Sequence, residues 1–116
     1  MYGILLDMIG DKDLVVPMEP NSRQYAPELM DAFYAHAEAI GLGKTFPKED
    51  GPLIEDDHIC LNEAGLPTID LIDFDYKPWH TLADTVDKVS ATSLGKIGKQ
   101  LQTWLEKKPP YEIVKE

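Results

Sequence analysis

The sequence predicts one α/β domain, because two nearly continuous apolar segments typical of buried strands alternate with two amphipathic segments typical of helices. The strand segments are residues 3–9 and 67–72, and the main helical segments are residues 26–40 and 93–107. A chain of 116 residues, 43% of them hydrophobic, is long enough for one hydrophobic core. In such a sheet, functional sites are expected where parallel strands reach their carboxyl ends.

The sequence predicts three strands, two of them buried and one at an edge. Residues 3–9 are apolar almost throughout and end at Gly10, which predicts a strand buried on both faces of a parallel sheet. A central strand of this kind needs a neighbour on each edge, which is unusual so early in a chain. Residues 67–72 predict a second buried strand, and residues 13–17, which stop at Pro17, predict an edge strand.

The helical segments are marked by their apolar periodicity and their ends. Residues 26–40 have a proline and an acid in the first turn and an apolar stripe made of Leu29, Phe33, Ala37 and Ile40. We expect His36, which lies between two alanines, to be exposed to solvent. Residues 93–107 predict a helix with a Ser or Thr cap and one apolar side, formed by Leu94, Ile97, Leu101, Trp104 and Leu105.

The remaining segments are predicted to connect these elements. They are a surface loop at 44–52, a short helix at 57–64, a loop at 73–85 and a tail at 109–116 that begins with two prolines, so the domain is expected to span residues 1–108.

Composition and charge exclude several classes of function. The formal net charge of −10 repels nucleic acid and anionic membrane surfaces, and no run approaches the ~20 apolar residues that span a bilayer. The single cysteine, Cys60, rules out an internal disulfide and any zinc site with several cysteines. The first residues lack the basic leader and the cleavage pattern of a signal peptide, so we do not expect this sequence to encode export.

Acidic side chains follow or interrupt the predicted apolar segments. Asp7 lies within an apolar strand, where a lone carboxylate is costly unless a cation or hydrogen-bond donors meet it. A helix cap or a buried ion pair would satisfy it equally well. Residues 55–57 are three consecutive acids followed by His58, and either Asp56 or Asp57 could cap the next helix instead of serving chemistry.

A third group lies in the aromatic-rich loop. His80 follows Trp79 and precedes Asp84 by four residues, a pattern in which one imidazole nitrogen can bind a metal while the other meets an orienting acceptor. A lone loop histidine is more often a surface residue. Asp7 and His80, at neighbouring strand ends, are nevertheless ligands of the type found in catalytic zinc sites.

The motifs taken together are similar to those of a known superfamily. LDMIGD at 6–11, IEDDH at 54–58, GLPTIDLID at 65–73 and WHT at 79–81 resemble, in this order, the zinc exopeptidase superfamily of bacterial aminopeptidases and glutaminyl cyclases. The resemblance runs from about residue 3 to residue 107. It implies the C-terminal half of a three-layer α/β/α domain, with few sheet strands flanked by two main helices.

The resemblance also implies roles for four residues. Asp7 corresponds to a zinc ligand of the two-metal aminopeptidases and to a hydrogen-bonding acid near the metal in single-zinc cyclases. His80 corresponds to a zinc ligand in both groups. Asp56 corresponds to a pocket acid of the cyclases, and Trp79 corresponds to a residue that lines their substrate pocket.

One departure limits what can be expected of this chain. The family places a His-x-Asp pair and a Glu-Glu pair, which carry metal ligands and the general base, upstream of the matching motifs. This sequence contains neither string. Since a catalytic zinc needs about three protein ligands, we expect a fragment that binds zinc weakly and is inactive alone.

Three functional interpretations follow. The first is part of a zinc-dependent aminopeptidase, which would hydrolyse N-terminal residues from a peptide substrate. The second is part of a glutaminyl-cyclase-like acyltransferase, which would cyclise an N-terminal glutamine. The third is a non-catalytic remnant in which the strand at 3–9 leaves an edge unpaired, so that the chain forms a homo-oligomer or associates with a missing N-terminal half.

Overall fold

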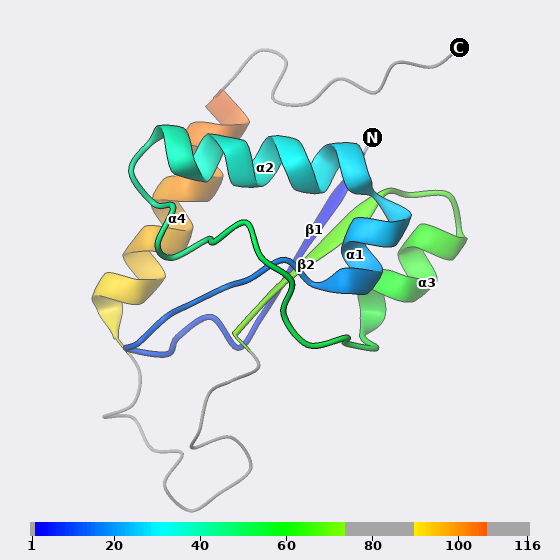
Figure 1. Cartoon of the computed structure of the whole chain (residues 1–116), viewed down its shortest axis with the longest axis horizontal. Helices are drawn as coiled ribbons and strands as arrows, with labels where there is room; N and C mark the ends of the chain where they lie inside the picture. The colour runs from blue at the N-terminus through cyan, green and yellow to red at the C-terminus, as the bar shows by residue number, and fades with distance from the viewer. Residues whose placement is uncertain (1, 74–89, 107–116) are drawn as a thin grey trace, which may run out of the picture.

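The computed structural model of the chain describes residues 2–73 and 90–106 (Figure 1). Its helices and strands are, in chain order, β1 (Gly3–Asp7), α1 (Pro20–Tyr25), α2 (Pro27–Ala39), α3 (Asp57–Glu63), β2 (Thr68–Ile72) and α4 (Ala91–Glu106). The predicted α/β class is confirmed. The predicted loop at 73–85, apart from its first residue, and the tail at 109–116 lie outside the described residues.

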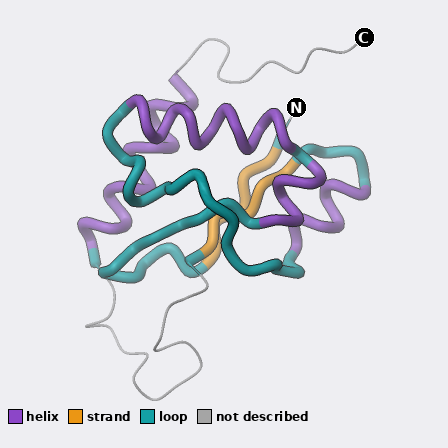
Figure 2. Tube along the Cα trace, in the orientation of Figure 1, coloured by secondary structure: helices purple, strands orange, loops and turns teal. Residues whose placement is uncertain are grey.

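The two strands form a parallel sheet in the described part of the chain, with Gly3 opposite Thr68 and Asp7 opposite Ile72 (Figure 2). This register places Asp7 at the carboxyl end of the sheet, where the sequence predicts a site. Every residue of β2 is buried, as predicted. The prediction that the first strand is buried on both faces is wrong, since β1 is only half-buried and Leu6 is 40% exposed.

The predicted edge strand at 13–17 does not form. The segment is extended, but it pairs locally with the loop after α2: the Val16 N–H donates to the Thr45 carbonyl at 2.7 Å, and Met18 forms an isolated parallel bridge with Asp50. The inward residue Val16 is fully buried, whereas Val15 is 42% exposed. The apolar pattern of this segment therefore predicted the burial of Val16 correctly. The backbone of the segment, however, pairs with a loop and not with a strand of the sheet.

The core lies between the sheet and the two longest helices, α2 and α4. The buried stripe of α2 includes Leu29, Phe33 and Ala37, as predicted, and the Tyr34 hydroxyl donates to the carbonyls of Val16 and Pro17. The Phe33 ring packs edge-on against Trp104 of α4, with centroids 5.2 Å apart. The whole apolar cluster comprises Leu14, Val16, Met18, Ala26, Leu29, Met30, Phe33, Tyr34, Ala37, Phe46, Ile69, Leu71, Ile97 and Trp104.

Helix α4 begins two residues earlier than predicted and carries the expected cap, because the Ser90 hydroxyl accepts from the Ser93 N–H at 3.3 Å. Ile97 and Trp104 are buried as predicted, but Leu94 and Leu105 are 44% and 60% exposed. These two leucines lie at the margins of the apolar stripe of α4.

The expectation that His36 is exposed is wrong. Its side chain is buried, Nε2 lies 2.8 Å from the Thr103 hydroxyl, and the ring packs against Trp104 at 5.9 Å. Since Thr103 and Trp104 belong to α4, the histidine lies in the interface between α2 and α4.

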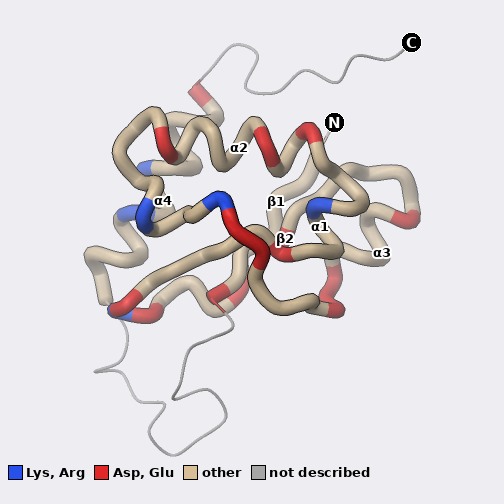
Figure 3. The backbone as a smooth tube through the Cα atoms, viewed as in Figure 1, with Lys and Arg blue, Asp and Glu red and all other residues tan. Residues whose placement is uncertain are grey.

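The short helix α1 was missed by sequence reasoning, because six residues are too few for a periodic pattern. Helix α3 was predicted correctly. Acidic residues are spread over helices and loops alike (Figure 3). Among the helices of residues 2–73 and 90–106, none combines the length and apolarity that a membrane crossing requires.

The core predicts a clear contrast between two leucines. Leu71→Ala removes a fully buried side chain of β2 and should lower the free energy of unfolding by about 2–5 kcal/mol, because it leaves a cavity. Leu53→Ala, at a position that is 65% exposed, should change it by no more than about 0.5 kcal/mol. Urea unfolding followed by circular dichroism measures both, and equal losses would contradict this assignment of the core.

Candidate active site

Three aspartates from three different elements meet at one end of the sheet. Asp7 is the last residue of β1, Asp70 lies in the middle of β2, and Asp56 is the N-cap of α3. The Asp56 carboxyl is close enough to each of the other two to form a carboxyl-to-carboxyl hydrogen bond when one member of the pair is protonated. We call Asp7, Asp56 and Asp70 the acid cluster.

The position of each carboxyl has a local cause. Asp56 is extended, and its Oδ1 accepts from the Asp57 N–H at 2.8 Å, so the predicted cap of this helix is Asp56. Met8 turns the chain sharply after β1 with a φ of 52°, a left-handed conformation that is unfavourable for this residue type, and its N–H donates to the Asp7 carboxyl. The turn thereby holds Asp7 at the sheet end.

A pair of close carboxyl groups is stable only if they share a proton. As fully ionised groups, Asp56 Oδ2 and both Asp70 oxygens would be buried with no donor among the described residues. Burial, and then the hydrogen bond and the negative charge of Asp56, raise the pKa of Asp7. Burial, and then the charge and hydrogen bond of Asp56, raise the pKa of Asp70 to about 8.

Asp56 is the member of the cluster that holds the negative charge. Burial alone would raise its pKa, but the Asp57 N–H, the carboxyl protons of Asp7 and Asp70 and the nearby His58 together lower it. The cluster therefore combines one carboxyl whose pKa is lowered, Asp56, with two whose pKa values are raised, Asp7 and Asp70. Such an arrangement can accept a proton on Asp56, donate one from a neighbour, or attract a cationic amine.

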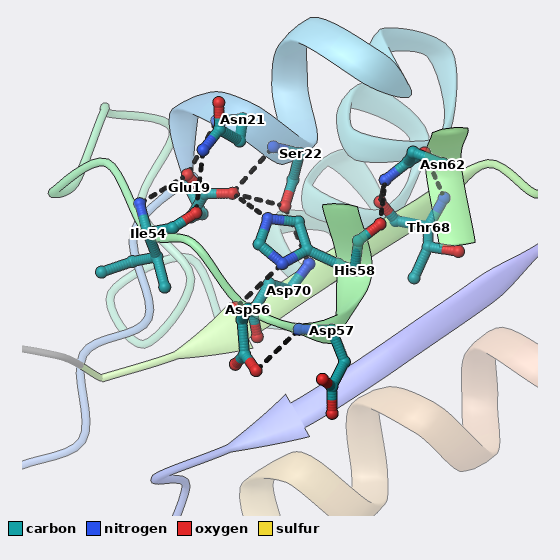
Figure 4. Close-up of polar contacts among 10 residues, drawn as sticks. All are labelled: Glu19, Asn21, Ser22, Ile54, Asp56, Asp57, His58, Asn62, Thr68 and Asp70. Atoms are coloured by element: carbon teal, nitrogen blue, oxygen red, sulfur yellow. Dashed lines mark hydrogen bonds and ion pairs between the residues drawn. The ribbon is translucent and has the colours of Figure 1, made fainter. Parts of the chain in front are cut away.

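Next to Asp70 lies a buried contact between Glu19 and His58 that sequence reasoning missed (Figure 4). His58 Nε2 is 2.7 Å from Glu19 Oε1, and His58 Nδ1 is 3.4 Å from Asp70 Oδ2, with all three side chains almost fully buried. The Glu19 carboxylate also caps α1, accepting from the N–H groups of Asn21 and Ser22. No sequence signal joins Glu19 to His58, because they are 39 residues apart and meet only in the fold.

Two of the predicted site residues cannot be placed, since Trp79 and His80 lie outside the described residues, as does Asp84. Of the four, the structure brings Asp7 and Asp56 together. Within the described ranges there is no group of three His, Cys, Asp or Glu side chains that could hold a metal ion. The described residues alone therefore do not make a zinc site, and Asp7 is the one predicted ligand among them.

Comparison with known proteins assigns the family. Residues 1–105 match peptidase family M28. The chain belongs to this family. The match confirms the predicted resemblance to zinc exopeptidases and glutaminyl cyclases, and it covers both strands, the acid cluster and nearly all of α4.

The names of the proteins that this chain resembles describe two kinds of activity. The bovine glutaminyl-peptide cyclotransferase is 29% identical over 112 residues, which cover 88% of this chain and 31% of the relative. The glutaminyl cyclase of Porphyromonas gingivalis superposes with a TM-score of 0.84 at 34% identity, covering 90% of this chain and 41% of that one.

Solved exopeptidases superpose equally well on this M28 chain. A leucine aminopeptidase precursor from Bacteroides thetaiotaomicron has a TM-score of 0.81 at 36% identity, covering 86% of this chain and 35% of that one. A Zn-dependent exopeptidase from Parabacteroides distasonis has a TM-score of 0.80 at 30% identity, covering 86% and 37%. The chain thus spans about a third to two-fifths of the length of its relatives.

The acid cluster predicts a pH dependence of stability. A pKa of about 8 for Asp70, against an ordinary 3.8, means that the folded chain binds this proton more tightly than the unfolded chain does. The resulting stabilisation is complete below pH 3.8 and is lost as the pH rises through about 8. Between these values this group alone lowers the free energy of unfolding by at most about 1.4 kcal/mol per pH unit.

The matched variants are Asp70→Asn and Asp31→Asn, the second at an exposed position of α2. Urea unfolding between pH 5 and pH 9 should show a flatter pH profile for Asp70→Asn, whose amide replaces the protonated carboxyl. Asp31→Asn should keep the wild-type profile. A wild-type slope in Asp70→Asn would mean that Asp70 is ionised in the folded chain.

The metal expectation is tested by calorimetry. The isolated chain should bind zinc in the micromolar range or more weakly, because three protein ligands are needed and the described residues contribute one. Asp7→Ala and His80→Ala should each weaken this binding further, whereas Asp31→Ala should not. Tight binding that survives both substitutions would place the ligands elsewhere.

Proposed function

We propose that this chain forms the acid side of the active site of an M28 enzyme that acts on the free amino terminus of a peptide, and that its reaction is of the glutaminyl cyclase type. The observation that carries the proposal is the pair of neighbouring carboxyls at the carboxyl end of β1, in which the pKa of Asp56 is lowered and the pKa of Asp7 is raised. A cyclisation needs such a pair, because one group must remove a proton while another supplies one.

The chemistry assigns a role to each carboxyl. The α-amino nitrogen of an N-terminal glutamine attacks the carbon of its own side-chain amide, so that a C–N bond forms within a five-membered lactam. The attacking nitrogen loses a proton to Asp56. The bond from that carbon to the amide nitrogen then breaks, and the proton held by the Asp56–Asp7 pair is delivered to the departing nitrogen, which leaves as ammonia.

The rest of the site is proposed on the resemblance and the family. Zinc is the proposed cofactor of the complete domain, with His80 and Asp7 as the ligands or near neighbours that this chain contributes, and Trp79 as a wall of the substrate pocket. Asp70 and His58, which are both buried, interact with Asp56 and lower its pKa. The isolated chain is expected to be inactive even with zinc.

A second candidate is hydrolysis of N-terminal residues. It is supported by the likeness to the leucine aminopeptidase precursor, which is as close as the likeness to the cyclases in identity and TM-score. In that reaction the ionised Asp56 would attract the cationic amino terminus of the substrate instead of moving its proton.

Two chimeras separate these candidates. Residues 3–105 of this chain replace the matched segment in the P. gingivalis cyclase and, separately, in the B. thetaiotaomicron aminopeptidase. We expect the first chimera to release ammonia from a Gln-peptide and the second to leave a Leu-anilide intact. The reverse result would overturn the cyclase proposal in favour of the peptidase.

Within the active chimera, Asp56→Asn should lower kcat by about 100-fold or more, the size of a general acid–base contribution. The matched control Asp31→Asn should retain activity. Undiminished turnover in Asp56→Asn would show that Asp56 neither takes nor delivers the proton. The isolated chain, assayed beside the chimeras with zinc, should turn over neither substrate.

A further inference from the structure

A line of buried polar side chains leads from the acid cluster into the interior (Figure 4). The imidazole of His58 lies between two carboxyls, with Nε2 2.7 Å from Glu19 Oε1 and Nδ1 3.4 Å from Asp70 Oδ2. Beyond His58, the line continues from Asp70 to Asp56. Because Glu19, His58 and Asp70 are buried, each of their polar atoms needs a partner within the protein, and this need determines where the protons lie.

The Glu19 end of the line accepts hydrogen bonds only. Its carboxyl accepts from the backbone N–H groups of Asn21, Ser22 and Ile54 and from the Ser22 hydroxyl. A proton on either Glu19 oxygen would displace one of these donors. In the 2.7 Å contact between Glu19 and His58, the donor is therefore the Nε2–H group of His58.

The Asp56 end of the line also accepts. Its Oδ1 accepts from the Asp57 N–H at 2.8 Å, and its buried Oδ2 has no donor among the described residues other than a protonated neighbouring carboxyl. The pKa of Asp56 is lowered, whereas that of Asp70 is raised to about 8. Asp70 is therefore the member of this pair that keeps a proton at pH 7, and it donates that proton to Asp56.

The remaining atoms decide the charge of His58. His58 Nδ1 and both Asp70 oxygens are buried without a donor among residues 2–73 and 90–106. The single proton of Asp70 is directed to Asp56. With a neutral His58, the lone pairs of Nδ1 and of Asp70 Oδ2 would then face each other at 3.4 Å in a buried place, which is costly. A second proton on the ring, at Nδ1, removes this conflict.

We propose that His58 is a buried imidazolium that donates from Nε2 to Glu19 and from Nδ1 to Asp70. The negative charge of Glu19, in contact with the ring, compensates for the buried positive charge. Each donor on the other side of the ring is directed toward the acid cluster, from His58 to Asp70 and from Asp70 to Asp56. His58 is thus a positioning residue, which acts on Asp56 through Asp70.

The consequence for the site rests on the proposed function. Asp56 removes a proton from the attacking amine, and every acceptor behind it is already protonated. The proton therefore stays on Asp56 until the departing nitrogen takes it. A neutral His58 would instead be a sink, because the Asp70 proton could move to Nδ1 and the Asp56 proton could then move to Asp70. The charge on His58 keeps the transferred proton at the substrate side of the cluster.

The first experiment observes the ring protons of His58 by NMR in the complete chain, labelled with nitrogen-15 histidine. At pH 7.5 both ring nitrogens of His58 should carry a proton, although a free histidine, with a pKa of about 6.5, is mostly neutral there. A single ring N–H on His58 would overturn the proposal.

Two variants test the source of the charge in the same spectrum. Glu19→Gln should leave one ring N–H on His58, because the compensating charge is gone, whereas the exposed control Asp31→Asn should keep both. Two ring N–H groups retained in folded Glu19→Gln would overturn the pairing of His58 with Glu19. The spectrum of the unaltered chain decides the charge of His58 even if Glu19→Gln does not fold.

The second experiment measures the positioning role in the active chimera. His58→Gln, which is neutral, should lower kcat by about tenfold or more and change KM by less than about twofold, because His58 acts through Asp70 and not on the substrate. The matched control is His36→Gln, at the buried histidine of the α2–α4 interface, which should retain kcat. Unchanged kcat in His58→Gln, or an equal loss in both variants, would overturn the positioning role. Chimeras that turn over neither substrate would refute the proposed function, while the NMR result would still decide the charge of His58.

Discussion

The Glu19 carboxylate is the contact on which the arrangement of the site depends. It accepts hydrogen bonds from the start of α1, from the Ile54 N–H in the loop before α3, and from His58 within α3. Through the Ser22 hydroxyl, which donates to Glu19 and accepts from the Asp70 N–H, it is joined to β2 as well. One buried charge thus fixes two helices, a loop and a strand relative to one another.

Such a charge is tolerated because each of its oxygens is satisfied. An unpaired carboxylate at this depth would destabilise the fold by several kcal/mol, and replacing either partner of the His58 pair would leave the other buried and unpaired. The same contacts determine where α3 begins. Since Asp56 caps that helix, the position of its carboxyl beside Asp7 and Asp70 follows from the Glu19–His58 pair.

The acid cluster lies at the carboxyl end of β1, which pairs with β2 along one edge in the described part of the chain. The raised pKa values of Asp7 and Asp70 favour protons held among the crowded carboxyls of the cluster. The described residues leave Leu6 of β1 partly uncovered, since its side chain is 40% exposed. The described part of the chain thus holds a cluster of carboxyls at the end of a two-stranded sheet, and the chain covers about a third to two-fifths of the length of its relatives.

Local patterns in the sequence were sufficient for the class of fold, both strands, the helices at 27–39, 57–63 and 91–106, and the placing of Asp7 and Asp56 at element ends. These features depend on apolar spacing and on capping, which act over a few residues. The burial of His36, the pairing of the 13–17 segment with a loop, the Glu19–His58 pair and the inclusion of Asp70 in the site were decided by the tertiary structure alone. Each depends on which distant segments come into contact, and a buried polar side chain acquires its partner, its protonation and its role only from those contacts.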